Sequence, residues 1–281
     1  MKFRIARLLP IPLALLVISL FGIYQVYSRS GNIFLRDIDL KGGTSLTLIF
    51  NTSIDITDLE QVLKQKIDNF IISVSKTSEG FTSVNVLTEK SIEVNETISL
   101  LNSKGFYPAE YSIQFVGPEL GSAFFSQVAS LLIIAYVLLF IVNLFIYKNP
   151  IVGFTIILSS LTNIVAVFGI MNLLNQKISF AGFSSLLMLI AFAIDTNVIL
   201  ATKVLFAPKE EFYEQYKKSL ITGITINANL VISMLIVLYL TNSSFLINIA
   251  QIQIIGFLAD IVNTWILNAS LIEVILLGKR Y

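Results

Sequence analysis

The 281-residue chain contains no cysteine and no histidine, and only 13% of its residues are charged. Without cysteine it has neither disulfides nor thiolate metal sites, and without histidine it lacks the commonest metal ligand and the usual acid/base side chain. Any proton chemistry must therefore use carboxylates, and we expect no metal, no cofactor and no enzyme activity. The net charge of +1 provides no basic surface, so we also expect no nucleic-acid partner.

Hydrophobic residues make up 55% of the chain, and the mean hydropathy is +0.81. These values are typical of an integral membrane protein, in which a helix of about 20 apolar residues spans the lipid bilayer. The first apolar run is too long for a signal peptide and no small-residue cleavage site follows it, so we predict an uncleaved anchor. The sequence predicts six spanning helices, at residues 8–27, 122–147, 151–174, 178–202, 220–240 and 245–277.

Basic residues near the ends of the spans indicate the orientation, because they stay on the cytoplasmic side. With the N-terminus inside, ten such residues are cytoplasmic and only Lys177 lies in a short outer loop. The pattern predicts a multi-pass protein of the cell membrane with both termini cytoplasmic. Residues 29–121 are then extracytoplasmic.

The segment between the first two spans has the pattern of a small α+β domain. Alternating β-formers and apolar residues at helical spacing predict strand 44–50, helix 55–70, strand 71–76, strand 81–87, helix 91–103 and strand 109–116. The βαββαβ order is that of a ferredoxin-like unit. We therefore predict an integral membrane α-helical protein: helix one at 1–28, an extracytoplasmic ferredoxin-like domain at 29–121, and helices two to six at 122–281.

Two short segments join this domain to the membrane helices. Paired glycines before the first strand suggest a tight turn or a close backbone approach, and a Gly-Pro step after the last strand ends it. We interpret both joints as hinges, with a plain linker as the alternative. The residues concerned are Asp39, Gly42, Gly43 and Thr44 at the first joint and Gly117, Pro118 and Gly121 at the second.

Asp195 is the only charged residue in the span 178–202. A carboxylate near the middle of a membrane span costs about 2.5–3.5 kcal/mol, so such residues usually face a cavity or a partner. The alternative is a protonated Asp195 that is hydrogen-bonded to a neighbouring helix.

Polar residues also form stripes on three other predicted helices, at about 100° per residue. The stripes are Gln253, Gly256, Asp260, Asn263 and Thr264 on the sixth helix, Thr222, Thr225, Asn229 and Ser233 on the fifth, and Ser159, Asn163 and Ala166 on the third. Most of their hydroxyls serve interhelical packing.

A carboxyl group, unlike a hydroxyl, exchanges protons at neutral pH. Asp195 and Asp260 are therefore candidates for proton coupling, and we expect Asp260 to help supply the partner that Asp195 needs. Near the predicted cytoplasmic end, Glu273 lies close in sequence to Lys279 and Arg280, so we expect it to be an interface residue. The supporting polar residues are Asn163, Asn197, Asn229, Asn263 and Thr264.

Four motifs in order resemble the SecD/SecF family of protein-export membrane proteins, in particular its archaeal SecF branch within the RND permease superfamily. They are D-L-K-G-G-T at 39–44, V-G-P-E-L-G at 116–121, I-A-F-A-I-D-T-N-V-I-L-A-T-K-V-L at 190–205 and G-F-L-A-D-I-V-N-T-W-I-L-N-A at 256–269. The outer segment of roughly ninety residues favours SecF over the longer SecD. The resemblance implies an accessory subunit of the Sec translocase in the lipid bilayer. Its implied partners are a SecD-like membrane subunit, the Sec translocation channel and the translocating polypeptide.

The resemblance also implies that Asp195 takes part in proton-linked conformational change. Where relatives carry further acids, this chain has Asn163 and Asn197, and fewer carboxylates weaken a proton relay. Two other functions compete, and a purely structural scaffold for a partner complex is a further alternative. The same acids fit one half of an RND-type transporter for small molecules or ions. An intramembrane aspartyl protease using Asp195 and Asp260 is disfavoured, because Asp260 lacks a Gly-x-Gly-Asp context.

Overall fold

The structure is a computed structural model that describes residues 4–37, 40, 42–52, 54–67, 70–76, 82–88, 92–116, 118–241 and 243–278. It divides into two compact units. The first is helical and comprises Met1–Leu35, Ala129–Thr241 and Phe245–Tyr281, and the second comprises Arg36–Val128 with Asn242–Ser244.

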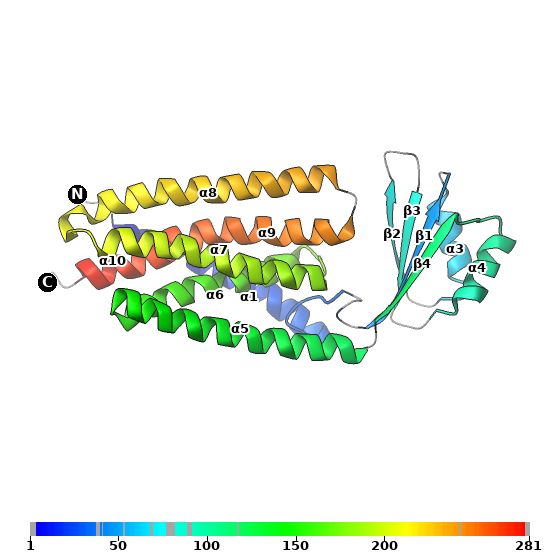
Figure 1. Cartoon of the computed structure of the whole chain (residues 1–281), viewed down its shortest axis with the longest axis horizontal. Helices are drawn as coiled ribbons and strands as arrows, with labels where there is room; N and C mark the ends of the chain where they lie inside the picture. The colour runs from blue at the N-terminus through cyan, green and yellow to red at the C-terminus, as the bar shows by residue number, and fades with distance from the viewer. Residues whose placement is uncertain are drawn as a thin grey trace. The chain divides into compact units, whose positions relative to one another are not determined.

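Six long apolar helical runs confirm the expected number of membrane spans. Three of the helices begin at a proline, Pro10, Pro118 and Pro150, where the missing N–H is harmless. At the starts of two helices, the side chains of Asn149 and Ser179 accept backbone N–H groups. The elements are η1 (Ile5–Leu8), α1 (Pro10–Ser30), α5 (Pro118–Tyr147), α6 (Pro150–Leu173), α7 (Phe180–Leu205), η2 (Lys209–Glu211), α8 (Phe212–Leu240), α9 (Ser244–Val262), η3 (Asn263–Asn268) and α10 (Ala269–Leu277) (Figure 1).

Helices α1 and α6 pack so closely that two glycines are needed between them. A Cβ added at Gly169 would lie 2.3 Å from the backbone of Ser19, and one added at Gly22 would lie 2.3 Å from the carbonyl oxygen of Gly169. Small residues of this kind let membrane helices approach backbone to backbone.

The six spans differ in how much of their surface is buried by the rest of the described chain. About half of the most apolar window is buried in α6 and α7, at 56% and 50%, but only 11% in the span containing α8 and 6% in that containing α5. The exposed helices α5 and α8 therefore leave most of their surface for lipid or for other membrane proteins.

Where α10 meets η1, Glu273 ties together three segments that are distant in sequence. Its carboxylate accepts the backbone N–H of Ala6 at 2.9 Å and the hydroxyl of Tyr213 at 2.5 Å. Glu273 is 4% exposed, so the expectation that it is an interface residue is wrong. Burial is possible because both oxygens find donors inside the chain. Lys279 and Arg280 lie outside the described residues.

Near the C-terminal end of α6, the side chain of Asn172 holds the segment that follows α1. Its amide nitrogen donates to the carbonyl of Ile33 at 2.9 Å, and its oxygen accepts the N–H of Leu35 at 3.2 Å. Phe34 stacks on Phe168 with ring centroids 5.0 Å apart.

The second unit confirms the expected βαββαβ order. Its strands are β1 (Gly43–Phe50), β2 (Phe70–Lys76), β3 (Thr82–Thr88) and β4 (Glu110–Val116), in the antiparallel order β2-β3-β1-β4. Helices α3 (Ile56–Leu63) and α4 (Val94–Ser103) cover one face of the sheet (Figure 1). The core between the layers contains, among others, Leu46, Leu48, Val84, Val86, Leu59 and Leu101.

Helix α3 is shorter than the predicted helix 55–70. It starts after Asp55, whose carboxylate accepts the N–H of Thr57 at 2.8 Å, and it ends at Leu63. Ile67, counted as helical from its spacing, instead enters the core after a turn, and Phe70 begins β2. Residues 77–80, between the predicted strands 71–76 and 81–87, lie outside the described residues.

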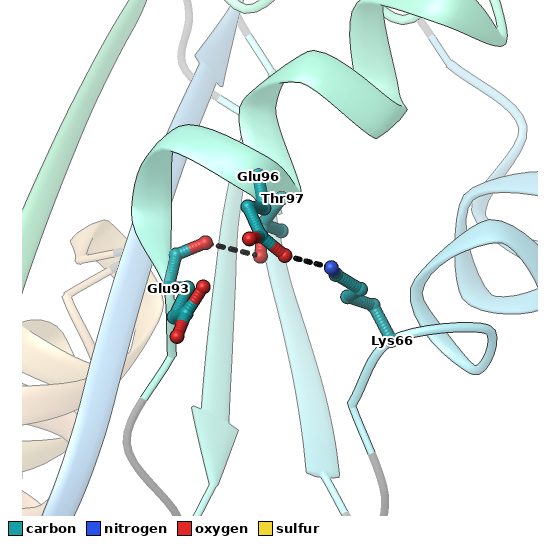
Figure 2. Close-up of polar contacts among 4 residues, drawn as sticks. All are labelled: Lys66, Glu93, Glu96 and Thr97. Carbon is teal, nitrogen blue, oxygen red and sulfur yellow. Dashed lines mark hydrogen bonds and ion pairs between the residues drawn. The ribbon is translucent and has the colours of Figure 1, made fainter.

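An ion pair links α4 to the turn after α3. Lys66 contacts Glu96, while the hydroxyl of Thr97 donates to the carbonyl of Glu93 at 3.0 Å at the start of the helix (Figure 2). The hydrogen bond with Lys66 lowers the pKa of Glu96, and the same bond raises the pKa of Lys66.

Both joints to the membrane helices are only partly visible, because Asp39 and Gly117 lie outside the described residues. Gly42 and Gly43 have φ angles of 86° and 149°, in the region that favours glycine. Thr44 is buried in β1. The second joint differs from expectation, since Pro118 and Gly121 already belong to α5. A helix can start at proline because its fixed φ suits the first turn.

Candidate functional site

A single carboxylate, Asp260, forms the centre of a buried polar cluster in the helical unit. The side chain is 1% exposed. Its Oδ1 accepts hydrogen bonds from Asn163 Nδ2 at 2.9 Å and Thr264 Oγ1 at 2.8 Å. Its Oδ2 accepts from Thr196 Oγ1 and Asn227 Nδ2, both at 2.9 Å. The donors come from α6, α7, α8 and η3, so four elements meet at one acid.

Glycines bring these helices close enough for short polar side chains to meet. A Cβ at Gly256, one turn before Asp260, would lie 2.3 Å from Leu189 of α7. On α8, a Cβ at Gly223 would lie 1.9 Å from the ring of Trp265. Thr264 reaches Asp260 through helix spacing, because it follows Asp260 by four residues and lies on the same face.

Further amide side chains form hydrogen bonds around the residues that contact Asp260. Asn263 Nδ2 donates to Asn163 Oδ1 at 2.6 Å, which turns the Asn163 amide nitrogen toward Asp260. Asn268 Nδ2 donates to Asn197 Oδ1 at 2.5 Å, and Asn197 Nδ2 donates to the carbonyl of Ala193 at 2.6 Å. The predicted residues Asn163, Asn197, Asn263 and Thr264 are thus all buried in this region.

Helix α9, which carries Asp260, ends at Val262 and continues as the wider π-helix η3, Asn263–Asn268. Such segments are rare and occur frequently at functional sites. Three of the cluster residues, Asn263, Thr264 and Asn268, belong to it.

The hydrogen bonds define the chemistry of the acid. An ionised carboxylate accepts through about four lone-pair sites, and Asp260 receives four donors. No lysine or arginine among the described residues forms an ion pair with Asp260. Any negative charge on Asp260 would therefore be compensated by the dipoles of these donors alone.

Asp195 does not join this cluster, and the expectation that Asp260 would lie beside it is wrong. Its side chain is exposed on the surface of α7 and has no hydrogen bond or ion pair to another described residue. The cause is helix geometry: Thr196 faces Asp260, and the preceding residue is turned by about 100°.

The polar stripe predicted on the fifth helix also faces outward. Asn229 is exposed on α8 and does not contact Asp260, whereas Asn227 is 1% exposed and does. The buried face of α8 instead carries Ser219, Gly223 and Asn227, at i, i+4 spacing. This small-residue pattern could have identified Asn227, since closely packed membrane helices favour it. Thr196 and Asn268 were also missed.

Comparison with known proteins places this chain in a family. The family model "Protein export membrane protein SecD/SecF, C-terminal" matches residues 97–277, which is more than half of the chain. The chain belongs to the SecD/SecF family. Within it, the protein-export membrane protein SecF of Methanocaldococcus jannaschii is 29% identical over 280 residues, covering 96% of this chain and 95% of the relative. The SecF of Pyrococcus furiosus is 27% identical, covering 96% and 90%.

Solved structures of this SecD/SecF family have the same fold. SecDF from Thermus thermophilus, a translocon-associated membrane protein, superposes with a TM-score of 0.74 at 18% identity. A second SecDF structure, in a super-membrane-facing form, gives 0.66 at 16% identity. In both cases 97% of this chain is covered, but the chain spans only 38% of the SecDF chain. At this identity the likeness concerns the fold alone.

Proposed function

We propose that the chain is an accessory subunit of the protein-export translocase and works beside a SecD-like membrane subunit. The observation that carries this proposal is family membership over most of the chain, together with relatives named protein-export membrane protein SecF that align over nearly their full length. SecDF chains contain this fold within a longer polypeptide, which supports a second membrane subunit as its partner.

The exposed position of Asp195 supports the same partner. Asp195 lies within the span Phe180–Leu205, at a depth where a carboxylate facing lipid is costly. A polar group from another subunit removes that cost. We propose that this face of α7 meets the SecD-like subunit and that Asp195 takes up and releases the proton that drives movement of the outer domain.

Export can be tested in a host strain that lacks the gene and secretes poorly. Tagged protein is expected to co-purify with a SecD-like subunit and the translocation channel, and to restore secretion. Asp195→Asn should keep the partners but lose the rescue, whereas Ser184→Ala, an exposed residue on the same helix, should behave like the wild type. Absence of both partners would overturn the export proposal, and full rescue by Asp195→Asn would overturn proton coupling at this residue.

The distribution of basic residues supports cytoplasmic termini and an extracytoplasmic outer domain. Because the chain has no cysteine, single cysteines report sidedness cleanly. In intact cells, Lys104→Cys should react with a membrane-impermeant maleimide, and Glu210→Cys should react only after the cells are opened. The reverse pattern would invert the orientation.

A further inference from the structure

A short segment before α1 is inserted into one end of the helical unit. Residues 4–9, named the plug below, consist of the 3₁₀-helix η1 and its two flanking residues, and η1 contacts α10 and η3. Ile5 is 2% exposed, whereas Arg4 and Arg7 are exposed. One apolar side chain of the plug is therefore buried in the bundle, while its charged neighbours stay outside.

The side chain of Ile5 fills a space between several helices. Its apolar cluster includes Ile156 of α6, Ala201 of α7, Phe212 of α8 and Trp265 of η3, all at most 1% exposed. These elements are far apart in sequence, and the plug closes the end of the bundle at which they meet.

The plug itself is held by few interactions. In the part of the chain that the structure describes, one hydrogen bond ties it to an element other than α1: the N–H of Ala6 donates to Glu273 Oε2 at 2.9 Å. Short 3₁₀-helices have poorer internal hydrogen bonds than α-helices. A segment held by one hydrogen bond and one buried side chain can open while the helices stay folded.

The interior next to the plug is polar. Trp265 Nε1, Asn268 Oδ1 and Ser270 Oγ are buried, and none of these atoms has a hydrogen-bond partner among the described residues. Ala269, which lies between Asn268 and Ser270 in sequence, packs in the same cluster as Ile5. Unpaired buried polar groups are costly, and water is their usual partner in protein interiors.

We propose that the plug opens and closes this end of the helical unit to water. In the closed state Ile5 seals the apolar cluster and Ala6 bonds to Glu273. In the open state the plug moves outward about Leu9, where it joins α1, and water hydrates the three unpaired polar atoms. Glu273 then keeps its hydrogen bond from Tyr213. The plug acts within one chain and does not rest on the export function, so either proposal can fail alone.

Because the chain has no cysteine, a single cysteine can report water behind the plug. In Ser270→Cys, a small charged methanethiosulfonate reagent should modify the thiol slowly. Adding Ile5→Ala should raise this rate about ten- to a hundredfold, because three carbon atoms no longer hold the plug closed. Adding Ile156→Ala removes the same side chain from the same cluster and should leave the rate unchanged. A second probe, Ser185→Cys, is buried between α7 and α9 and should react equally slowly in all three backgrounds.

Hydrogen–deuterium exchange of the purified full chain in detergent gives a measurement that needs no substitution. Residues 4–9 should exchange about a hundred times faster than α6, because the plug opens without the helices. Exchange of residues 4–9 as slowly as α6 would overturn the proposal, since the plug would then open only with the whole fold. Equal labelling of Ser270→Cys with and without Ile5→Ala would also overturn it, as would an equal increase with Ile156→Ala. If Ile5→Ala does not fold, exchange in the wild type still decides the question.

Discussion

Asp260 and Asp195 are acids of the same helical unit with opposite surroundings. Asp260 is enclosed by four donors, and Asp195 is exposed on α7. The first is satisfied within the chain and the second is not, since no described residue bonds to it. Substitutions at Asp260 should therefore act on the isolated chain, and substitutions at Asp195 on its complexes.

Two asparagines of α8 provide a matched pair at the residue scale. Asn227→Leu removes one of the donors to Asp260, and we expect the free energy of unfolding to fall by about 1–3 kcal/mol, because part of a buried charge loses its partner. Asn229→Leu changes an exposed side chain and should stay within about 0.5 kcal/mol of the wild type.

Chemical unfolding of the full chain in detergent, followed by circular dichroism, measures both variants. Equal losses in the two would mean that the contact between Asn227 and Asp260 contributes nothing.

At this scale the sequence predicted part of the site. The stripes on the third and sixth helices were placed correctly, because Asn163, Asp260, Asn263 and Thr264 are all buried. The stripe on the fifth was not, because polarity alone does not distinguish a face toward the core from a face toward another subunit. Contacts such as Thr196 to Asp260 depend on helix rotation, which a single sequence does not specify.

At the scale of elements, the contact between α1 and α6 depends on a missing side chain. Gly169→Ala places a methyl group 2.3 Å from the Ser19 backbone, so the helices must separate, and we expect a loss of about 1–3 kcal/mol in the free energy of unfolding. Gly153→Ala is the control on the same helix, because its added carbon would meet neighbours only at 3.5 Å. It should be neutral or stabilising by up to about 1 kcal/mol, since alanine favours the helix.

The melting temperatures of the two alanine variants test this contact. A Gly169→Ala protein as stable as Gly153→Ala would show that α1 and α6 can separate at no cost.

The ion pair between Lys66 and Glu96 makes a prediction about pH. Because the pKa of Glu96 is lowered in the folded state, its contribution is present above the unfolded pKa and is lost as pH falls through the folded one. Carbon-13 NMR of the full chain should place the Glu96 midpoint below that of an ordinary glutamate. In Lys66→Met it should rise toward the ordinary value, because the largest cause of the lowered pKa is removed. Both side chains are exposed, so the effect on stability is small.

An unchanged midpoint in Lys66→Met would exclude this pair as the cause of the lowered pKa.

The order of strands and helices in the outer unit was predictable from apolar spacing, but the end of α3 was not. The spacing of Ile67 fits two arrangements equally well: a further turn of helix, or a core residue that follows a turn of the chain. Only the position of the sheet decides between these two arrangements.

At the scale of the whole molecule, burial is uneven: about half of the most apolar window is buried in α6 and α7, and much less in the spans containing α5 and α8. The number of spans followed from composition, because length and hydropathy alone identify a membrane helix. Which helix faces a partner did not follow from composition, since lipid and protein interiors are equally apolar.

Two single-cysteine variants on α7 test which face of this helix meets the partner. Ala191→Cys lies on the exposed side with Asp195, and Ala193→Cys on the buried side. In membranes that contain the SecD-like subunit, a benzophenone attached to the thiol of Ala191→Cys should, on illumination, insert into a C–H bond of that subunit, and one on Ala193→Cys should not. No adduct at Ala191→Cys in complexes that still co-purify would place the partner on another face.

The π-helix η3 also sets the phase of everything that follows it. Its bonds skip one residue more than those of an α-helix, so it holds an extra residue in its turn. If the same residues were wound as a regular α-helix, α10 would be rotated by about 100°. Asp260 would stay among its donors, but Glu273 would swing away from Ala6 and Tyr213. The chain thus needs an odd residue in mid-helix so that one helix can serve two buried acids that a regular spiral would point in different directions.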